Sequence, residues 1–324
     1  MQSLVRLWGG NSGFGSLMSE CPHIPIMKSG DDKRAVPVYL LITFIFSSVF
    51  YFLVIKSGHV LGGAGAYVTA LMWCPAVAAL LTCKYLGRDV RTLGWKWGDP
   101  RYQVWSYLIP LAYGTATYAV VWLTGLGGFY NIAFVSEVTK SFGLGPLPPW
   151  AAITLYLVFA ATTGIVGSCA TAMGEEIGWR GFLVPELAKH TSFAATALIS
   201  GCIWALWHYP IVIFADYKAG TATWYAVTCL TVQLVALSFV FAWMRLKSGS
   251  LWTGVLLHAS HNLFIQAFFD PITADTGRTK YVIGEFGAAL SVVFILLGAY
   301  FWTRRSEVSR PVGDAASGKY PILA

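Results

Sequence analysis

Charged residues are scarce in this chain. Only 11% of the 324 residues are Asp, Glu, Lys or Arg, whereas 56% are hydrophobic. Several uncharged runs exceed the roughly 18 residues that indicate a membrane-spanning helix. This composition excludes a single soluble domain and predicts an all-α, polytopic integral membrane protein in contact with the lipid bilayer.

Patterns that would indicate other classes of protein are missing as well. The six cysteines are scattered, and no two have the spacing of a zinc knuckle or a redox motif. No apolar core of a cleavable signal peptide precedes the first long apolar run. No run of interleaved basic and aromatic residues is present, so we expect no nucleic-acid partner. The net charge of +7 instead fits membrane topology and contact with anionic lipids.

Eight apolar runs are each near the length of about 20 residues that crosses the hydrocarbon core as a helix. They are Pro37–Ile55, Val60–Cys83, Tyr102–Leu123, Pro149–Met173, Thr191–Ala215, Ala219–Met244, Gly249–Phe269 and Gly287–Trp302. We therefore predict about eight transmembrane helices in one domain over residues 37–303. Residues 1–36 are predicted to form a mobile N-terminal tail, and residues 304–324 a C-terminal tail.

The basic residues predict the orientation, because Lys and Arg accumulate on the cytoplasmic side of membrane proteins. With both termini in the cytoplasm, 17 basic residues lie inside, and 5 lie outside, namely Lys56, Lys140, Lys218, Arg278 and Lys280. The asymmetry favours an even number of spans and cytoplasmic tails. We expect the plasma membrane if the protein is bacterial and the endoplasmic reticulum if it is eukaryotic.

Two adjacent carboxylates, Glu175 and Glu176, follow the fourth run. Charge in or beside a bilayer is costly, so the pair indicates a functional site. Arg180 is four residues after Glu176 and could form a structural salt bridge with it within one helix. Glu175 points about 100° away from Glu176 around that helix and faces a different space. The motif therefore suits one structural and one catalytic carboxylate.

The remaining polar residues within apolar runs are few. His208 ends a Trp-rich stretch of the fifth run and could face a cavity or donate to a helix carbonyl. His258 and Asn262, four residues apart in the seventh run, project from one helix face and could grip one atom or bond to another helix. His261 is interpreted as a supporting or packing residue.

Together these residues are the polar set that hydrolysis of an amide requires. A carboxylate can take a proton from water, and a histidine can orient that water or share the proton. An Asn and a His can donate hydrogen bonds to the oxyanion as it forms. No covalent nucleophile is needed.

The same residues form three ordered motifs, which are Glu175-Glu176-x-x-x-Arg180, Trp204-x-x-x-His208 in place of the commoner Phe-x-x-x-His, and His258-x-x-x-Asn262. In order and spacing they resemble the motifs of the CPBP intramembrane proteases, which include the type II CAAX prenyl endopeptidase and bacterial Abi-type proteins. The resemblance covers about residues 149–269, which we predict to be the protease core.

The resemblance implies an intramembrane endopeptidase with assigned roles for its motif residues. It implies that Glu175 and His208 activate the water and that His258 and Asn262 form the oxyanion site. Glu176 and Arg180 would then support the first motif. The implied substrate is a protein or peptide, associated with the membrane and prenylated in eukaryotes.

The presence of a metal is a separate question. Members of this family are often labelled metalloproteases, and Glu175, His208 and His258 could hold zinc with an open position for water. Yet the chain has no His-Glu-x-x-His pair, and the amide of Asn262 is a poor zinc ligand and a good oxyanion donor. We favour metal-free hydrolysis without a cofactor and keep zinc as the alternative.

Two other function classes use the same residues. A proton-coupled transporter would place buried Glu and His in a proton relay, and a continuous pathway to both faces would favour it. A non-catalytic immunity or binding protein is the third class. Counted from Trp150, Glu175 should lie close to the inner interface and His208 deeper. A hydrolase would then need a hydrated funnel that opens to the cytoplasm, with Glu175, His208 and His258 around one void.

Overall fold

The computed structural model describes residues 31–63, 65–143, 145 and 147–308. Over these residues the fold is almost entirely helical, and the one strand pair described is β1 (Gly128–Phe129) antiparallel to β2 (Thr273–Ala274). The all-α fold is confirmed. Most of the two predicted tails lies outside the described residues, but α1 already begins at Asp31, within the predicted N-terminal tail.

The first half of the described chain contains α1 (Asp31–Ser57), α2 (Ala66–Tyr85), the 3-10 turn η1 (Val90–Leu93), α3 (Pro100–Leu123), α4 (Ile132–Ser141), α5 (Pro149–Phe159) and the π-helical η2 (Ala160–Gly164). The second half contains α6 (Ile165–Glu176), the π-helical η3 (Ile177–Leu183), α7 (Val184–Ala188), α8 (Phe193–Phe214), α9 (Thr223–Ser248), α10 (Trp252–His261), the π-helical η4 (Asn262–Phe269), α11 (Asp270–Ile272), η5 (Thr279–Tyr281), α12 (Ala288–Thr303) and η6 (Arg305–Glu307).

Five stretches of helix are long and apolar enough to cross a membrane. They are Lys33–Ser57, Ala66–Tyr85, Pro149–Ala188, Phe193–Phe214 and Thr223–Ser248. Helices also cover the predicted third, seventh and eighth spans, of which α12 is a shorter apolar helix. The polytopic membrane class is therefore confirmed, whereas the count of eight spans and the cytoplasmic termini stay predictions.

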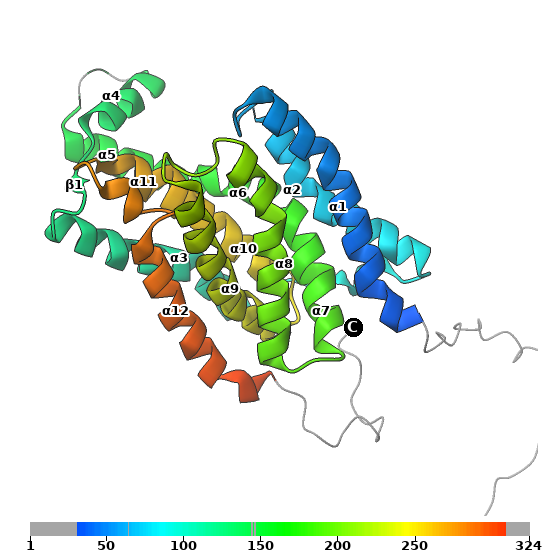
Figure 1. Cartoon of the computed structure of the whole chain (residues 1–324). Helices are drawn as coiled ribbons and strands as arrows, with labels where there is room; N and C mark the ends of the chain where they lie inside the picture. Colours follow the sequence, from blue (N-terminus) through cyan, green and yellow to red (C-terminus); the bar gives the residue numbers. More distant parts are fainter. Residues whose placement is uncertain (1–30, 64, 144, 146, 309–324) are drawn as a thin grey trace, which may run out of the picture.

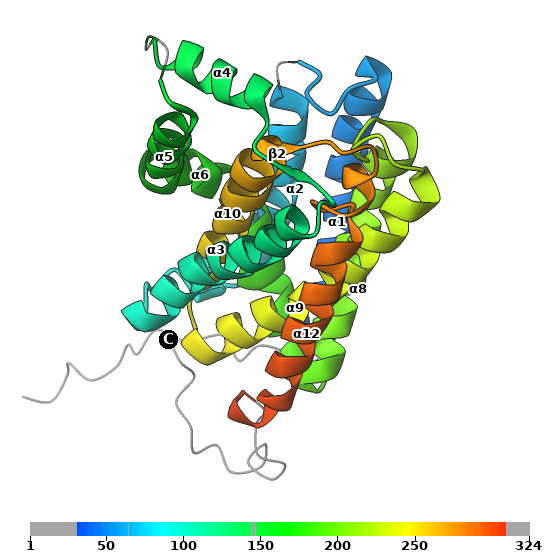
Figure 2. The same ribbon diagram turned by 90° about the vertical axis from the view of Figure 1, so that its left-hand side faces the viewer.

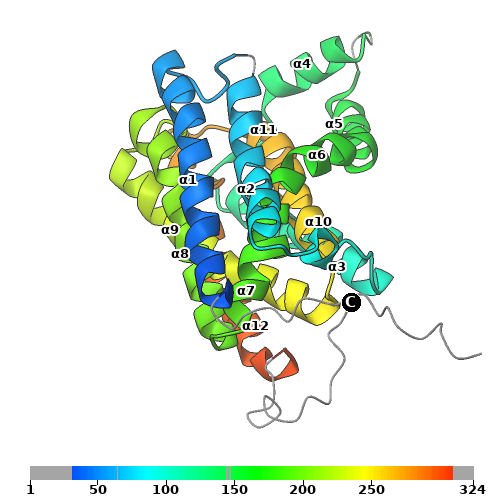
Figure 3. The same cartoon turned by 90° about the vertical axis from the view of Figure 1, so that its right-hand side faces the viewer.

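The helices form one bundle. Figure 1 shows α8, α9 and α12 side by side, Figure 2 shows α3 beside α10, and Figure 3 shows α1 beside α2. The connections 58–65 and 215–222 lie at the upper end in Figure 1, and α7 with the connection 189–192 lies at the lower end. Large apolar side chains on α1, such as Leu41, Ile45 and Phe52, point out of the bundle with exposed fractions of 56–62%. Such outward apolar faces suit contact with lipid tails.

The fourth predicted span continues further than expected. Its helix runs without a break from Pro149 to Ala188, through two π-helical segments, although the sequence predicts an end at Met173. Glu175 lies thirteen residues before the end of this helix at Ala188, a rise of about 20 Å. His208 lies fifteen residues after the start of α8, a rise of about 22 Å. Glu175 and His208 therefore lie at similar distances along their helices from the connection 189–192, because the charged residues do not end the helix.

Small residues allow this helix to approach α2 closely. A Cβ atom on Gly174 would lie 2.7 Å from the Met72 carbonyl oxygen, and one on Gly178 would lie 2.4 Å from Pro75 Cβ. Glycines four residues apart on one face are typical of tightly packed helices in membranes. The glycines thus place the intervening Glu175 and Glu176 in the middle of the bundle, where both are at most 2% exposed.

Candidate active site

The candidate catalytic side chains surround one cavity of about 620 Å³. Its lining includes Glu175 from α6, His208 from α8, His258 from α10 and Asn262 at the start of η4. The void predicted around Glu175, His208 and His258 is therefore present. These side chains come from three separate helices, because α10 continues into η4 without a break, so the site exists only in the folded bundle.

Glu175 is held by two tryptophans. Its Oε2 atom accepts hydrogen bonds from Trp204 Nε1 at 2.8 Å and from Trp179 Nε1 at 3.2 Å. Both donors bind the same oxygen, and the carboxylate lies in the cavity wall with 2% exposure. The tryptophan that replaces the commoner phenylalanine in the second motif thus orients the carboxylate of the first.

His208 combines the two roles that its sequence context allowed. Its Nδ1 lies 2.8 Å from the Trp204 carbonyl oxygen, one helical turn before it. Only a protonated Nδ1 can donate to that carbonyl, so the neutral ring keeps a lone pair on Nε2. Because His208 also lines the cavity, this nitrogen is available to accept a proton from water.

Glu176 connects the first motif to the third. Its Oε1 atom accepts from Arg180 Nη1 and from His258 Nδ1, both at 2.9 Å. The Arg180 guanidinium lies 4.1 Å from the Trp204 ring centre and 3.7 Å from that of Phe241. Arg180 is 2% exposed and lies within the continuous helix Pro149–Ala188. The bond to Glu176 fixes the orientation of the His258 imidazole through Nδ1, and Nε2 takes no part in it.

Asn262 and His261 lie at the other side of the cavity. Gln266 Nε2 donates to Asn262 Oδ1 at 3.4 Å. His261 Nδ1 lies 2.6 Å from the Tyr113 hydroxyl, and its Nε2 lies 3.7 Å from Glu285 Oε1. His261 therefore has a hydrogen-bond partner at Nδ1 and a carboxylate near Nε2 while it lines the cavity, in keeping with a supporting role.

Sequence reasoning missed Glu285, which lies between η5 and α12 and also lines the cavity. A single carboxylate between glycines, outside every apolar run, reads as a loop residue. Tyr217, which bonds to Glu285, was missed for the same reason, whereas Gln266 was missed as an uncharged polar residue within the seventh apolar run. Only the folding of the connections over the end of the bundle brings Tyr217 and Glu285 to the site.

The residues that line the cavity also show from which sides of the bundle it can be entered. Val60, Leu61 and Tyr217 come from the connections at the upper end in Figure 1, and exposed Thr69 and Phe159 line the side between α2 and α5. A second cavity of about 520 Å³ shares Val60, Tyr217, Gln266 and Glu285 with the first. No described residue of the basic connections 86–99, 189–192 or 249–251 lines either cavity. These two cavities thus form no pathway to both ends of the bundle.

The donor groups do not assemble a metal site. Among the described residues, no group of three or more His, Cys, Asp or Glu side chains could hold a metal ion. Glu175, His208 and His258 thus form no such group as they stand, and hydrolysis without a metal stays a prediction. Glu175 and His208 instead bond to indole and backbone groups within the protein.

Part of the chain is similar in sequence to known proteins. Residues 149–264 match the family described as Type II CAAX prenyl endopeptidase Rce1-like. A curated relative, CAAX prenyl protease 2 of Methanococcus maripaludis, is 27% identical over 94 residues, which are 28% of this chain and 34% of the relative. The match thus spans about a third of that relative's length. The matched segment contains all six motif residues, which are Glu175, Glu176, Arg180, His208, His258 and Asn262.

Proposed function

Because residues 149–264 match the family of Rce1-like type II CAAX prenyl endopeptidases, we propose that this chain is an intramembrane endopeptidase. The observation that carries this proposal is the convergence of Glu175, His208, His258 and Asn262 on one cavity within a bundle of apolar helices. Residues that polarise water and residues that can receive an oxyanion thus share one space.

The residues around the cavity have two different roles in the proposed reaction. Glu175 and the free Nε2 of His208 activate the attacking water, which adds to the peptide carbonyl. Asn262 and His258 donate hydrogen bonds to the oxyanion that forms. With Nδ1 bonded to Glu176, His258 can donate from Nε2 only as the charged imidazolium. Glu176 and Arg180 are structural and touch no substrate in this scheme.

We further propose that the substrate is a membrane-associated peptide with a prenylated C-terminal cysteine. The relative's name, CAAX prenyl protease 2, supports this class of substrate. The exposed side of the cavity between α2 and α5 is lined by Phe159 and Val68, which suit a lipid chain. A prenyl group can therefore reach the site from the bilayer while the peptide carbonyl lies among the polar residues.

The direct test is cleavage by the purified chain in liposomes of a farnesylated peptide that ends in Cys-aliphatic-aliphatic-X. We expect release of a C-terminal fragment, detected by mass spectrometry. The same peptide with serine in place of the prenylated cysteine should be cleaved more slowly. No cleavage of either peptide, under conditions in which the protein stays folded, would contradict the proposed substrate class.

Metal-free hydrolysis is also part of the proposal. We expect a chelator such as EDTA or 1,10-phenanthroline to leave the rate of cleavage unchanged, because the residues of the site bond to protein groups and assemble no metal site. Loss of activity with chelator, restored by added zinc, would show that a metal takes part.

A further inference from the structure

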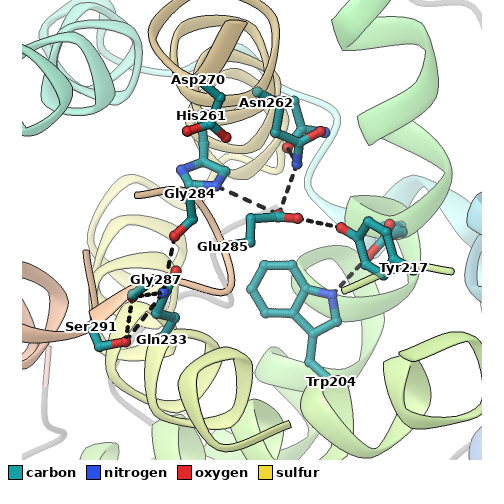
Figure 4. Close-up of polar contacts among 12 residues, drawn as sticks. Trp204, Tyr217, Gln233, His261, Asn262, Asp270, Gly284, Glu285, Gly287 and Ser291 are labelled. Atoms are coloured by element: carbon teal, nitrogen blue, oxygen red, sulfur yellow. Dashed lines mark hydrogen bonds and ion pairs between the residues drawn. The ribbon is translucent and has the colours of Figure 1, made fainter. Parts of the chain in front are cut away.

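Glu285 is a third carboxylate at the site, outside every motif of the sequence. Its side chain is 15% exposed. It accepts hydrogen bonds from the Tyr217 hydroxyl and from Gln266 Nε2, the latter at 2.8 Å, and His261 Nε2 lies 3.7 Å away. Figure 4 shows Glu285 between His261 and Tyr217. A charge so enclosed requires several donors, and Glu285 has them.

The segment that carries Glu285 is held in a defined conformation. Gly284 has a φ of +71°, and a Cβ atom there would lie 2.8 Å from Asp270 Oδ2. The Gly284 amide donates to the Tyr118 hydroxyl at 3.1 Å. Gln233 Nε2 donates to the carbonyl oxygens of Gly284 and Gly287, at 3.3 and 2.9 Å (Figure 4). These hydrogen bonds therefore hold the turn in one conformation, which directs Glu285 into the cavity.

Gln266 connects Glu285 to Asn262 through its side-chain NH2 group. An ionised carboxylate only accepts hydrogen bonds, so Glu285 holds the NH2 group of Gln266 on its own side. The same NH2 group donates to Asn262 Oδ1 at 3.4 Å. With its oxygen bonded in this way, Asn262 presents its own NH2 group elsewhere, and Asn262 lines the cavity. That orientation is the one an oxyanion donor needs, because a flipped amide would present oxygen to an oxyanion.

We propose that Glu285 is a positioning residue that, through Gln266, keeps the Asn262 amide turned with its NH2 group toward the reacting carbonyl. This inference rests on the proposed peptidase function. Glu285 itself contacts no reacting atom. Its effect should therefore appear in kcat, because an oxyanion forms only as the reaction proceeds, and KM should change little.

The sharpest test exchanges the two side chains in the double variant Gln266→Glu/Glu285→Gln. The contact between positions 266 and 285 is retained with its polarity reversed, so we expect the melting temperature to stay close to that of the wild type. The carboxylate now at position 266 can only accept, and Asn262 must turn its NH2 group toward it and away from the cavity. We expect kcat for the farnesylated peptide to fall about 10- to 100-fold, since loss of one oxyanion donor costs up to about 10³.

The isosteric single variant Glu285→Gln serves if the exchange prevents folding. It leaves the Gln266 amide free to rotate, and we expect kcat to fall several-fold at constant KM. Asp275→Asn is the matched control, because Asp275 is an exposed carboxylate that lines the second cavity without contacting Gln266. A folded exchange variant, or a folded Glu285→Gln variant, with wild-type kcat would overturn the proposal.

A variant of Glu175 distinguishes failure of the positioning role of Glu285 from failure of the proposed peptidase function. If Glu175→Gln is inactive and the position 285 variants keep full kcat, only the positioning role is wrong. If Glu175→Gln cleaves the peptide as fast as the wild type, the peptidase scheme itself is wrong.

Discussion

Glu175 and Glu176 are neighbours in the chain but have different partners. Glu175 accepts from two indole groups and borders the cavity, whereas Glu176 accepts from Arg180 and His258 in the packed interior. The helical offset of adjacent residues predicts this separation from the sequence alone. The bond from Trp204 to Glu175 could not be predicted, because it depends on how α8 is rotated against α6.

Glu176 should therefore matter for stability. Replacement in Glu176→Gln leaves the buried Arg180 guanidinium without its counter-charge, and we expect a loss of about 3–5 kcal/mol in the free energy of unfolding. Thermal unfolding of the protein in detergent measures this as a lower melting temperature. Glu137→Gln, on the exposed face of α4, is the control and should unfold like the wild type. Equal melting temperatures for both variants would contradict the structural role of Glu176.

At the scale of elements, hydropathy predicts where helices lie better than where they end. Every predicted span coincides with a helix, but the fourth continues beyond Met173 through Glu175, Glu176 and Arg180 to Ala188. Charged residues end a span only if they meet water, and here they meet one another. The π-helical segment η3 begins directly after Glu176, and η4 begins at Asn262. Such segments are frequent at functional sites, and no pattern in the sequence predicts them.

The contact between η3 and α2 gives an element-scale prediction. In Gly178→Ala the added methyl group would lie 2.4 Å from Pro75 Cβ and 2.5 Å from the Tyr39 hydroxyl oxygen. We expect the helices to separate, at a cost of about 1–3 kcal/mol in the free energy of unfolding. The matched control is Gly167→Ala on α6, where no atom lies within 4 Å of the added carbon. Unfolding in detergent should show a lower melting temperature for Gly178→Ala alone, and identical stabilities would argue against this close approach.

For the whole molecule, the sequence predicts the class, the order of helices and the set of motif residues that meet in one cavity. It does not predict how the connections cover the end of the bundle. Val60, Tyr217 and Glu285 border the cavity from segments that the basic residues assign to the outer side. That lining disagrees with the sequence-based expectation of a funnel toward the cytoplasm. If the cavity opens at this end, cytoplasmic termini and a cavity that faces the cytoplasm exclude each other.

Accessibility labelling decides the orientation. We expect cysteines introduced as Lys189→Cys and Lys218→Cys to react with a membrane-impermeant maleimide from opposite sides of sealed vesicles, because these positions lie at opposite ends of the bundle. The excess of basic residues predicts position 189 on the cytoplasmic side. Labelling of both positions from one side would contradict the bundle's arrangement in the membrane.

The rate of peptide cleavage by Glu175→Gln shows whether Glu175 acts as the base in the cavity that it shares with His208, His258 and Asn262. With the farnesylated peptide in liposomes, loss of the base should lower kcat by about 10²-fold to 10⁴-fold or more, while the melting temperature stays near that of the wild type and Glu137→Gln remains fully active. A folded Glu175→Gln variant that cleaves at the wild-type rate would show that Glu175 is not the base.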